Sequence, residues 1–345
     1  MKRLICLMMA LAMLFAAGCG KKDAKTDTKP VTQEQQEEAP PVEIEELSEN
    51  EFIQMVNSDT RPVAVMIDND GESSRPQIAL ESAYLLYEVT IEAGASRIMA
   101  LFKDTSVGKI GPIRSSRHYF LDYAMENDAI YTHAGWSPRA EADIPALGVN
   151  NINGILGNDG SIFYRDNTYD NTWHNLYTRV SDVYNFAGNN KKYRTTSDIR
   201  YTWYSEEEFE TEDGAPATEV SIPYSNYYKL NYKYNPETKL YDRFIGSKAH
   251  VSQTGNGLTA KNIIICHVNN YDLNDGQNKG RQEVETVGSG KGYVITNGKA
   301  NEITWSKASR EARTEYKYLN GEDIVLNAGN TYVQIVPVSS AVSFK

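Results

Sequence analysis

Between residues 51 and 204 the chain alternates short apolar runs with segments of helical periodicity. The first run is apolar at nearly every position, which is the pattern of a strand covered on both faces. A helix is predicted from about Ser115 to Glu126, and a shorter one that Ser48 and Glu51 would cap precedes the first run. Strands are predicted at 61–67, 83–90, 97–103 and 128–133. Residues 51–204 therefore predict an α/β-type domain with a mixed sheet.

The pattern changes after residue 204. Residues 205–216 are acidic and rich in turn formers, which predicts a domain boundary. Short runs of alternating polarity follow; Asn297-Gly298 is a strong hairpin signal and the glycine-rich stretch 288–292 is predicted as a turn. Strands are expected near 219–223, 228–234, 240–244, 263–268, 283–287, 293–296, 303–305, 324–326 and 332–336. Residues 205–345 predict a mainly antiparallel β domain, so the expected fold class is α+β.

The first 50 residues have the composition of an export signal followed by a linker. Residues 1–18 carry two basic residues and then an apolar stretch too short to span a bilayer, which predicts a signal peptide. The run ending at Cys19 resembles a lipobox, in which the cysteine becomes the acylated first residue. Residues 19–50 contain nine acidic residues and four lysines, which predicts a disordered tether. We expect a protein held on the extracytoplasmic side of a bacterial membrane by lipid on Cys19.

The charge and the cysteines narrow the function classes further. The net charge is −11 at pH 7, and nearly half of it falls in the predicted tether. Nucleic acid is excluded as a partner, because binding its backbone requires a dense basic field. Of the three cysteines, Cys6 lies in the signal and Cys19 is the predicted anchor, so Cys266 has no second cysteine with which to form a disulfide or a zinc site.

Polar side chains follow or interrupt the predicted strands. Asp68 and Asn69 come at the carboxyl end of the first buried strand, where ligands collect in open α/β sheets, although the same residues also form ordinary turns. Glu88 lies within the second strand and needs a cationic partner if it is buried. The candidate ligand-binding residues in this part of the chain are Asp68, Asn69, Arg75, Glu88 and Arg97.

The stretch Arg114-Ser-Ser-Arg117-His118-Tyr119 places three basic residues at a predicted helix start. Two guanidinium groups and the free N–H groups of a first helical turn would together hold an anion, and all four named residues are candidate ligand-binding residues. The alternative is a structural network in which Arg97, Arg114 and Arg117 neutralise Glu88 and join the sheet to the helix.

Two further histidines and an asparagine complete the candidate set: His133, His174 and Asn175. A lone histidine is more often a hydrogen-bonded structural residue than a catalyst, and neither HExxH nor HxH spacing supports a metal site. Nucleotide-binding and nucleophile-elbow motifs are absent as well, so no cofactor is predicted and no catalytic residue is assigned.

Several segments, taken in order, resemble the YerB-like bacterial lipoproteins, a family of unknown function. The resemblance spans roughly residues 60–340. It implies a two-domain, membrane-anchored, extracytoplasmic protein and no settled activity. The segments that carry it are Val65-Met-Ile-Asp-Asn69, Arg75-Pro-Gln77, Tyr87-Glu88, Gly108-Lys-Ile-Gly-Pro-Ile-Arg-Ser-Ser-Arg117, Tyr119-Phe-Leu-Asp122, His133-Ala-Gly-Trp-Ser-Pro138, His174-Asn-Leu-Tyr-Thr178, Gly280-Arg-Gln282, Gly290-Lys-Gly292, Asn297-Gly-Lys299 and Thr304-Trp-Ser-Lys307.

Two functions fit these observations. The first is an envelope lipoprotein that binds an anionic or glycan component of the cell envelope through Arg114, Arg117 and their neighbours. The second is an envelope enzyme acting on a phosphate- or glycan-containing substrate, in which the arginines stabilise charge and Asp68 or Glu88 acts as a base or binds a metal. Binding is favoured, because no catalytic motif supports the enzyme.

Overall fold

The computed structural model describes residues 47–345 except 212 and 278. The predicted signal peptide, Cys19 and most of the predicted tether lie outside the described residues. The first described helix, α1 (Glu49–Val56), begins after Ser48, whose side chain and that of Glu51 form the expected capping box. The other α-helices are α2 (His118–Glu126), α3 (Pro138–Ala146) and α4 (Val180–Asn189).

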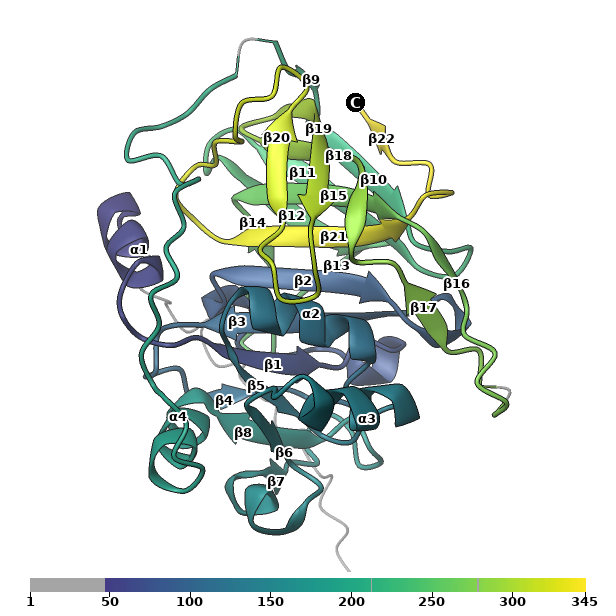
Figure 1. Cartoon of the computed structure of the whole chain (residues 1–345). Coiled ribbons are helices and arrows are strands. Elements are labelled where there is room, and N and C mark those ends of the chain that lie inside the picture. Colours follow the sequence, from purple (N-terminus) through teal and green to yellow (C-terminus); the bar gives the residue numbers. More distant parts are fainter. Residues whose placement is uncertain (1–46, 212, 278) are drawn as a thin grey trace, which may run out of the picture. The chain divides into compact units, whose positions relative to one another are not determined.

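One long sheet dominates the described part of the chain (Figure 1). Its strands run in the spatial order β20 (Glu315–Tyr318), β19 (Lys299–Lys307), β18 (Gly288–Thr296), β15 (Asn262–Val268), β21 (Thr331–Pro337), β2 (Leu85–Thr90), β3 (Ser96–Phe102), β1 (Val63–Ile67), β5 (Ile130–His133) and β6 (Asn151–Asn153), with β9 (Ala215–Pro216) beside β19. Parallel and antiparallel neighbours both occur, so the sheet is mixed.

The long sheet joins the two predicted domains. β21, near the end of the chain, lies between β2 and β15 and is parallel to both. Strands from either side of residue 204 therefore form one continuous hydrogen-bonded ladder. The division into domains at residues 204 and 205 stays a prediction.

A second, antiparallel sheet packs on one face of the long sheet. Its strands are β13 (Lys248–Ala249), β12 (Leu240–Ile245), β11 (Lys229–Asn235), β10 (Glu219–Pro223) and β22 (Ser343–Phe344), with β14 (Thr259–Ala260) beside β12. The smaller pairings involve β16 (Asn270–Asp272) with β17 (Gln282–Val284), and β4 (Lys109–Ile110), β8 (Leu176–Arg179) and β7 (Tyr164–Arg165). Few helices and many strands, in mixed and antiparallel sheets, make the fold α+β, as predicted.

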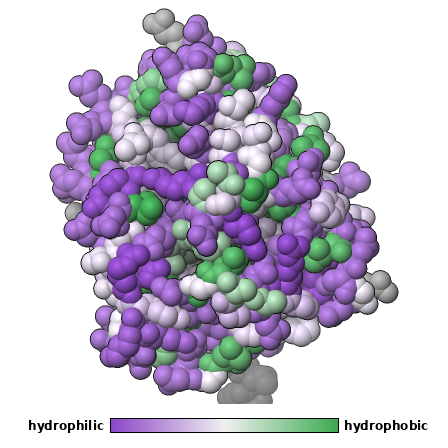
Figure 2. Space-filling view, viewed as in Figure 1, coloured by the Kyte–Doolittle hydropathy of each residue, from purple (hydrophilic) through white to green (hydrophobic). Residues whose placement is uncertain are grey.

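Two apolar cores cover the two faces of the long sheet. Side chains of α1, α2 and α3 pack on one face, whereas α4 and the second sheet pack on the other. Strand β1 shows why: all five of its residues are buried, with alternate side chains in opposite cores. Polar side chains cover most of the surface seen in Figure 2, where apolar residues occur in small separate groups.

Three local predictions were wrong. Helix α2 begins at His118 and not at Ser115, because Ser116 uses its hydroxyl to accept from Tyr131 and not to cap the helix. Residues 288–292, predicted as a turn, lie inside β18 and pair with β19. Residues 324–326 form only an isolated bridge from Leu326 to Tyr204. The Asn297-Gly298 hairpin between β18 and β19 was predicted correctly.

Candidate functional site

Two buried polar clusters meet at the carboxyl end of β1. Asp68 and Asn69 follow the strand, and both are fully buried. Their side chains enter different surroundings, as expected for successive residues of an extended chain. Asp68 meets arginines of the N-terminal region, whereas Asn69 meets Glu88 and residues of the second sheet.

The first cluster, which we call the arginine cluster, contains Asp68, Glu92, Arg97, Arg114, Arg117 and His174. His174 donates from Nδ1 to Asp68 Oδ2 at 2.7 Å, and Arg114 Nε lies 3.1 Å from the same oxygen. Arg117 donates to both oxygens of Glu92, at 2.6 and 2.9 Å. Arg117 is the N-cap residue of α2, and Arg114 lies three residues before it.

Arg97 is the unusual member of this cluster. It is only 3% exposed, and one nitrogen, Nη1, donates to the carbonyl of Ser115 at 2.8 Å. Its Nε has no hydrogen-bond partner among the described residues. No described carboxylate forms an ion pair with Arg97, although Asp68 and Glu92 are near enough to act on its charge. Burying a charge without a direct partner is unfavourable. The guanidinium of Arg97 therefore lacks a hydrogen-bond acceptor that would stabilise it.

The titration behaviour of the cluster follows from these contacts. Burial and the charge of Arg117 lower the pKa of Arg97 to about 10, so it is still charged at neutral pH. Burial alone would raise the pKa of Asp68, but the hydrogen bond from His174 and the charges of Arg97 and Arg114 hold it below its usual value. The hydrogen bond to Asp68 raises the pKa of His174. Three arginines thus face two carboxylates, which leaves an excess of one positive charge, or of two when His174 is protonated.

The second cluster, which we call the closed network, is centred on Glu88. One oxygen of Glu88 accepts from Asn69, Ser96 and Tyr228, and the other accepts from Arg243 Nη2 at 2.7 Å. Arg243 and Glu88 are both fully buried. The expectation that Arg97, Arg114 or Arg117 neutralises Glu88 is therefore wrong, because β12 supplies the cation.

The remaining donors of Arg243 are also used. Its Nε donates to His250 Nδ1 at 2.9 Å, and its Nη1 donates to the Tyr232 hydroxyl at 2.7 Å. Gln77 connects the two clusters, because it pairs with His250 and also donates to Asp68 O and Asn69 Oδ1. These contacts join β1 and β2 to the second sheet.

Sequence reasoning missed Arg243, although a signal was present. In the alternating strand β12, Arg243 has the same parity as Tyr241, so both point inward and both are buried. An inward-facing arginine needs a carboxylate partner, and Glu88 was a predicted strand residue that needed a cationic partner if buried. Pairing them across 155 positions requires knowledge of the tertiary fold.

The other predicted residues lie outside the arginine cluster, and one of them, Arg75, contacts Asn69 of the closed network. Arg75 donates to Asn69 O and Oδ1, so it supports the loop after β1. His118 pairs with Glu283 at 3.0 Å, and the Tyr119 hydroxyl donates to the carbonyl of Thr90. The remaining two have these partners: His133 with Gly135 O and Asn151, and Asn175 with Asn167 and Arg165.

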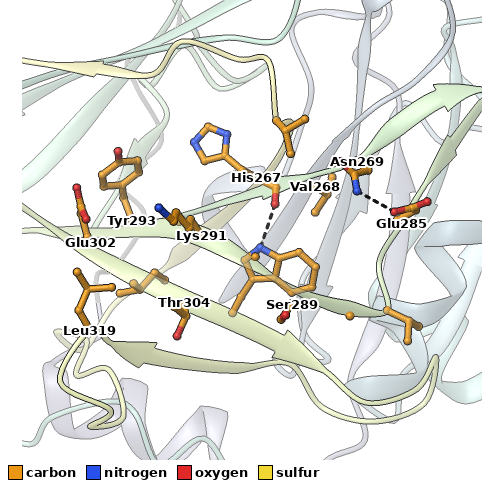
Figure 3. Close-up of a pocket in the computed structure, with 17 residues that line it drawn as sticks. His267, Val268, Asn269, Glu285, Ser289, Lys291, Tyr293, Glu302, Thr304 and Leu319 are labelled. Atoms are coloured by element: carbon orange, nitrogen blue, oxygen red, sulfur yellow. Dashed lines mark hydrogen bonds between the residues drawn. The ribbon is translucent and has the colours of Figure 1, made fainter.

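A separate cavity of about 640 Å³ lies on β15, β18 and β19 (Figure 3). His267, Lys291, Tyr293 and Glu302 contribute to its lining, and Trp305 Nε1 donates to the carbonyl of His267 at 3.1 Å. None of the predicted site residues lines this cavity. None of the described side chains that line this cavity carries a buried charged atom without a hydrogen-bond partner, as Arg97 does.

Comparison with known proteins places the chain in a family. Residues 51–194 match the "Protein of unknown function (DUF3048) N-terminal domain", and residues 220–333 match the corresponding C-terminal domain. The chain belongs to this YerB-like, two-domain family, as the resemblance predicted. The family is defined without an activity.

One relative, YerB of Bacillus subtilis, is matched both by sequence and by structure. The chain is 28% identical over 293 residues to "Putative lipoprotein YerB" of Bacillus subtilis. The aligned region covers 83% of this chain and 84% of the relative. The crystal structure of YerB protein from Bacillus subtilis matches with a TM-score of 0.72 and 26% identity, over 84% of this chain and 96% of that one. Within the described residues, no helix has the length and apolar character needed to span a bilayer. Nor do any three metal-ligating side chains described here gather into a metal site.

Proposed function

We propose that this protein is a lipid-anchored, extracytoplasmic lipoprotein whose arginine cluster binds an anionic or glycan-containing ligand of the cell envelope. The observation that carries the proposal is Arg97, a buried guanidinium with a free Nε and no ion pair among the described residues. A bound anion would supply the missing acceptor and balance the excess positive charge. Arg114, with its side chain 28% exposed, gives the cluster access to solvent.

The anchor is supported by the lipobox-like run at Cys19 and by the name of the Bacillus relative. The test is metabolic labelling with a radioactive fatty acid in a bacterial host. We expect label on the wild-type chain and none on Cys19→Ala. Equal labelling of the two chains would show that Cys19 is not the acylated residue.

Binding is tested by isothermal titration of inorganic phosphate and of anionic wall polymers into the purified chain. We expect binding that Arg97→Met and an Arg114→Ala, Arg117→Ala double variant both weaken at least about tenfold, the loss of a charge-assisted hydrogen bond. Arg179→Ala is the matched control, because Arg179 is exposed and forms its ion pair with Asp182, three residues away. Affinity unchanged in the double variant removes the arginine cluster from consideration.

One observation favours the enzyme as a second candidate. His174 donates from Nδ1 to Asp68, and its Nε2 has no partner among the described residues. A carboxylate that orients a histidine in this way is a common arrangement for a general base. Incubation with labelled phosphate- or glycan-containing envelope precursors and divalent metal tests it. Turnover that His174→Gln abolishes would establish catalysis, and no turnover in the wild type would leave binding as the function.

A further inference from the structure

Two exposed apolar residues lie on loops that carry or border residues of the arginine cluster. Trp173 is 68% exposed and directly precedes His174. Ile155 is 60% exposed, in the loop that follows β6. Leu156 and Tyr169, from the same two loops, are exposed as well. A contiguous group of large exposed apolar side chains marks a binding surface, whereas single scattered ones do not.

Ile155 lies close to Gly135 and Ser115, and Ser115 contacts the arginine cluster. A β-carbon placed on Gly135 would lie 3.2 Å from Ser115 Oγ and 3.5 Å from Ile155 Cδ1, so the two side chains flank the same point. The carbonyl of Ser115 is the group that accepts from Arg97 Nη1. Ile155 therefore borders the backbone that holds the unpaired arginine.

Trp173 directly precedes His174 in the chain, and His174 belongs to the arginine cluster. The backbone N–H of His174 donates to Asp170 Oδ2 at 2.9 Å, and Thr172 donates its backbone N–H to the same oxygen at 3.0 Å. These bonds brace the loop on both sides of Trp173. On the other loop, Asn153 Oδ1 accepts from the backbone N–H of Ile155 at 3.3 Å and from that of Gly135 at 3.0 Å. Both apolar side chains thus stand on backbone that hydrogen bonds fix in place.

We propose that the arginine cluster, Ile155 and Trp173 together bind one amphiphile, with a phosphate headgroup at Arg97 and Arg114 and a hydrocarbon chain against the two apolar residues. This inference rests on the proposed function, since the headgroup occupies the same arginines. A phosphate fits the excess of one or two positive charges, and its oxygens accept from several directions at once. The hydrocarbon part explains why Ile155 and Trp173 are exposed beside that charge.

The experiment uses the unacylated chain carrying Cys19→Ala, so that no acyl group of the protein competes. Isothermal titration compares inorganic phosphate, farnesyl phosphate and farnesol, each below its aggregation limit. We expect farnesyl phosphate to bind at least about tenfold more tightly than phosphate, because each buried methylene adds roughly a factor of four. Flotation with vesicles of phosphatidic acid in phosphatidylcholine, against phosphatidylcholine alone, tests whether a membrane phospholipid supplies the same headgroup.

Variants separate the headgroup from the chain. An Ile155→Ser, Trp173→Ser double variant should bind phosphate as the wild type does, while its gain for farnesyl phosphate is lost. Tyr227→Ser is the matched control, because Tyr227 is an exposed aromatic residue of the C-terminal region. Arg97→Met should weaken both ligands.

The outcomes distinguish the two proposals. If phosphate and farnesyl phosphate bind equally, and phosphatidic acid vesicles recruit no more chain than the control vesicles, the amphiphile is overturned and anion binding stands. If phosphate, wall polymers and farnesyl phosphate all fail to bind, both proposals fall. Farnesol binding as tightly as farnesyl phosphate would also overturn the amphiphile, because the headgroup would then contribute nothing.

Discussion

Asp68 and Glu88 are two fully buried carboxylates of the same sheet, and their surroundings differ in one respect. Glu88 has a dedicated arginine, Arg243, and the polar groups around this pair are satisfied by one another. Asp68 lies among three arginines, of which Arg97 has no ion pair among the described residues. The closed network pairs its carboxylate directly with one arginine, whereas the arginine cluster contains a buried cation without an ion pair among the described residues.

This difference separates the structural role of the closed network from the proposed binding role of the arginine cluster. A buried ion pair with all its hydrogen bonds made holds elements in register, and it offers nothing to a ligand. A buried cation without a partner lowers stability unless something else supplies the acceptor. Four predictions test the contrast, beginning with the one expected to have the largest effect.

The closed network should respond most strongly to loss of its cation. We expect Arg243→Met to lower the free energy of unfolding by about 3–5 kcal/mol, because Glu88 would stay buried without a charged partner. Urea unfolding followed by circular dichroism measures this. The Glu88→Gln, Arg243→Met double variant should recover part of the loss, since no charge is stranded. A neutral single substitution would contradict the structural role of the network.

Acid should affect the two clusters in opposite directions. Burial and the charges of Arg243 and Arg75 hold the pKa of His250 well below its usual value, so its contribution to stability is lost as pH falls below about 6.5. The raised pKa of His174 gives a contribution that is fully present below about 6.5 and is lost as pH rises through the folded value. We expect a smaller effect than for Arg243→Met, because no charge is stranded at neutral pH.

Urea unfolding between pH 5 and pH 8 separates these two histidines. His250→Gln should reduce the loss of stability on the acid side, and His174→Gln should flatten the decline above pH 6.5. Asn231→Gln provides a control, because Asn231 is in the same sheet as His250 and carries no titrating group. Identical pH profiles for both histidine variants and the wild type would argue against the assigned protonation states.

The arginine cluster should show a conflict between stability and binding. We expect Arg97→Met to leave the free energy of unfolding unchanged or to raise it by about 1 kcal/mol, while phosphate affinity falls at least about tenfold. Thermal unfolding and titration of the same preparation measure the two quantities. A large loss of stability would mean that Arg97 is a structural residue after all.

Glu92 should give the smallest effect. Glu92→Gln removes the partner of Arg117 and adds one positive charge to the cluster, so we expect phosphate affinity to rise severalfold. Stability should fall by about 1 kcal/mol or less, since the pair is partly exposed. Unchanged affinity would show that the overall charge of the cluster does not govern binding.

The fold class and most strands could be predicted from the sequence. A strand buried on one face shows alternating polarity, and a strand buried on both faces is apolar throughout. The sequence predicted β1, whose residues are apolar throughout, and the turn at Asn297-Gly298. It could not show that β21 inserts beside β2, since that pairing depends on the tertiary fold. The glycine spacing also did not indicate that residues 288–292 are extended. Their conformation depends on pairing with β19, which is not a local property of the sequence.

The candidate site was predicted in part. Asp68, Arg97, Arg114, Arg117 and His174 do lie in one cluster, although their role as ligand residues stays a prediction. Glu88 and Asn69 belong to the closed network, where they contact Tyr228 of the second sheet. Local sequence shows which residues carry charge, but their pairing is decided by contacts between distant segments.

The position of β21 has a consequence for folding during synthesis. Leu85 is paired with Thr331, and Asn262 with the same residue on the other side, so this late strand is the central element that links the two halves of the sheet. A chain that is made in order, amino end first, presents β2 and β15 with open edges until almost its last segment has appeared. Completion of the long sheet must therefore wait for the carboxyl end, and truncated chains would expose two unpaired strand edges that can pair with other chains.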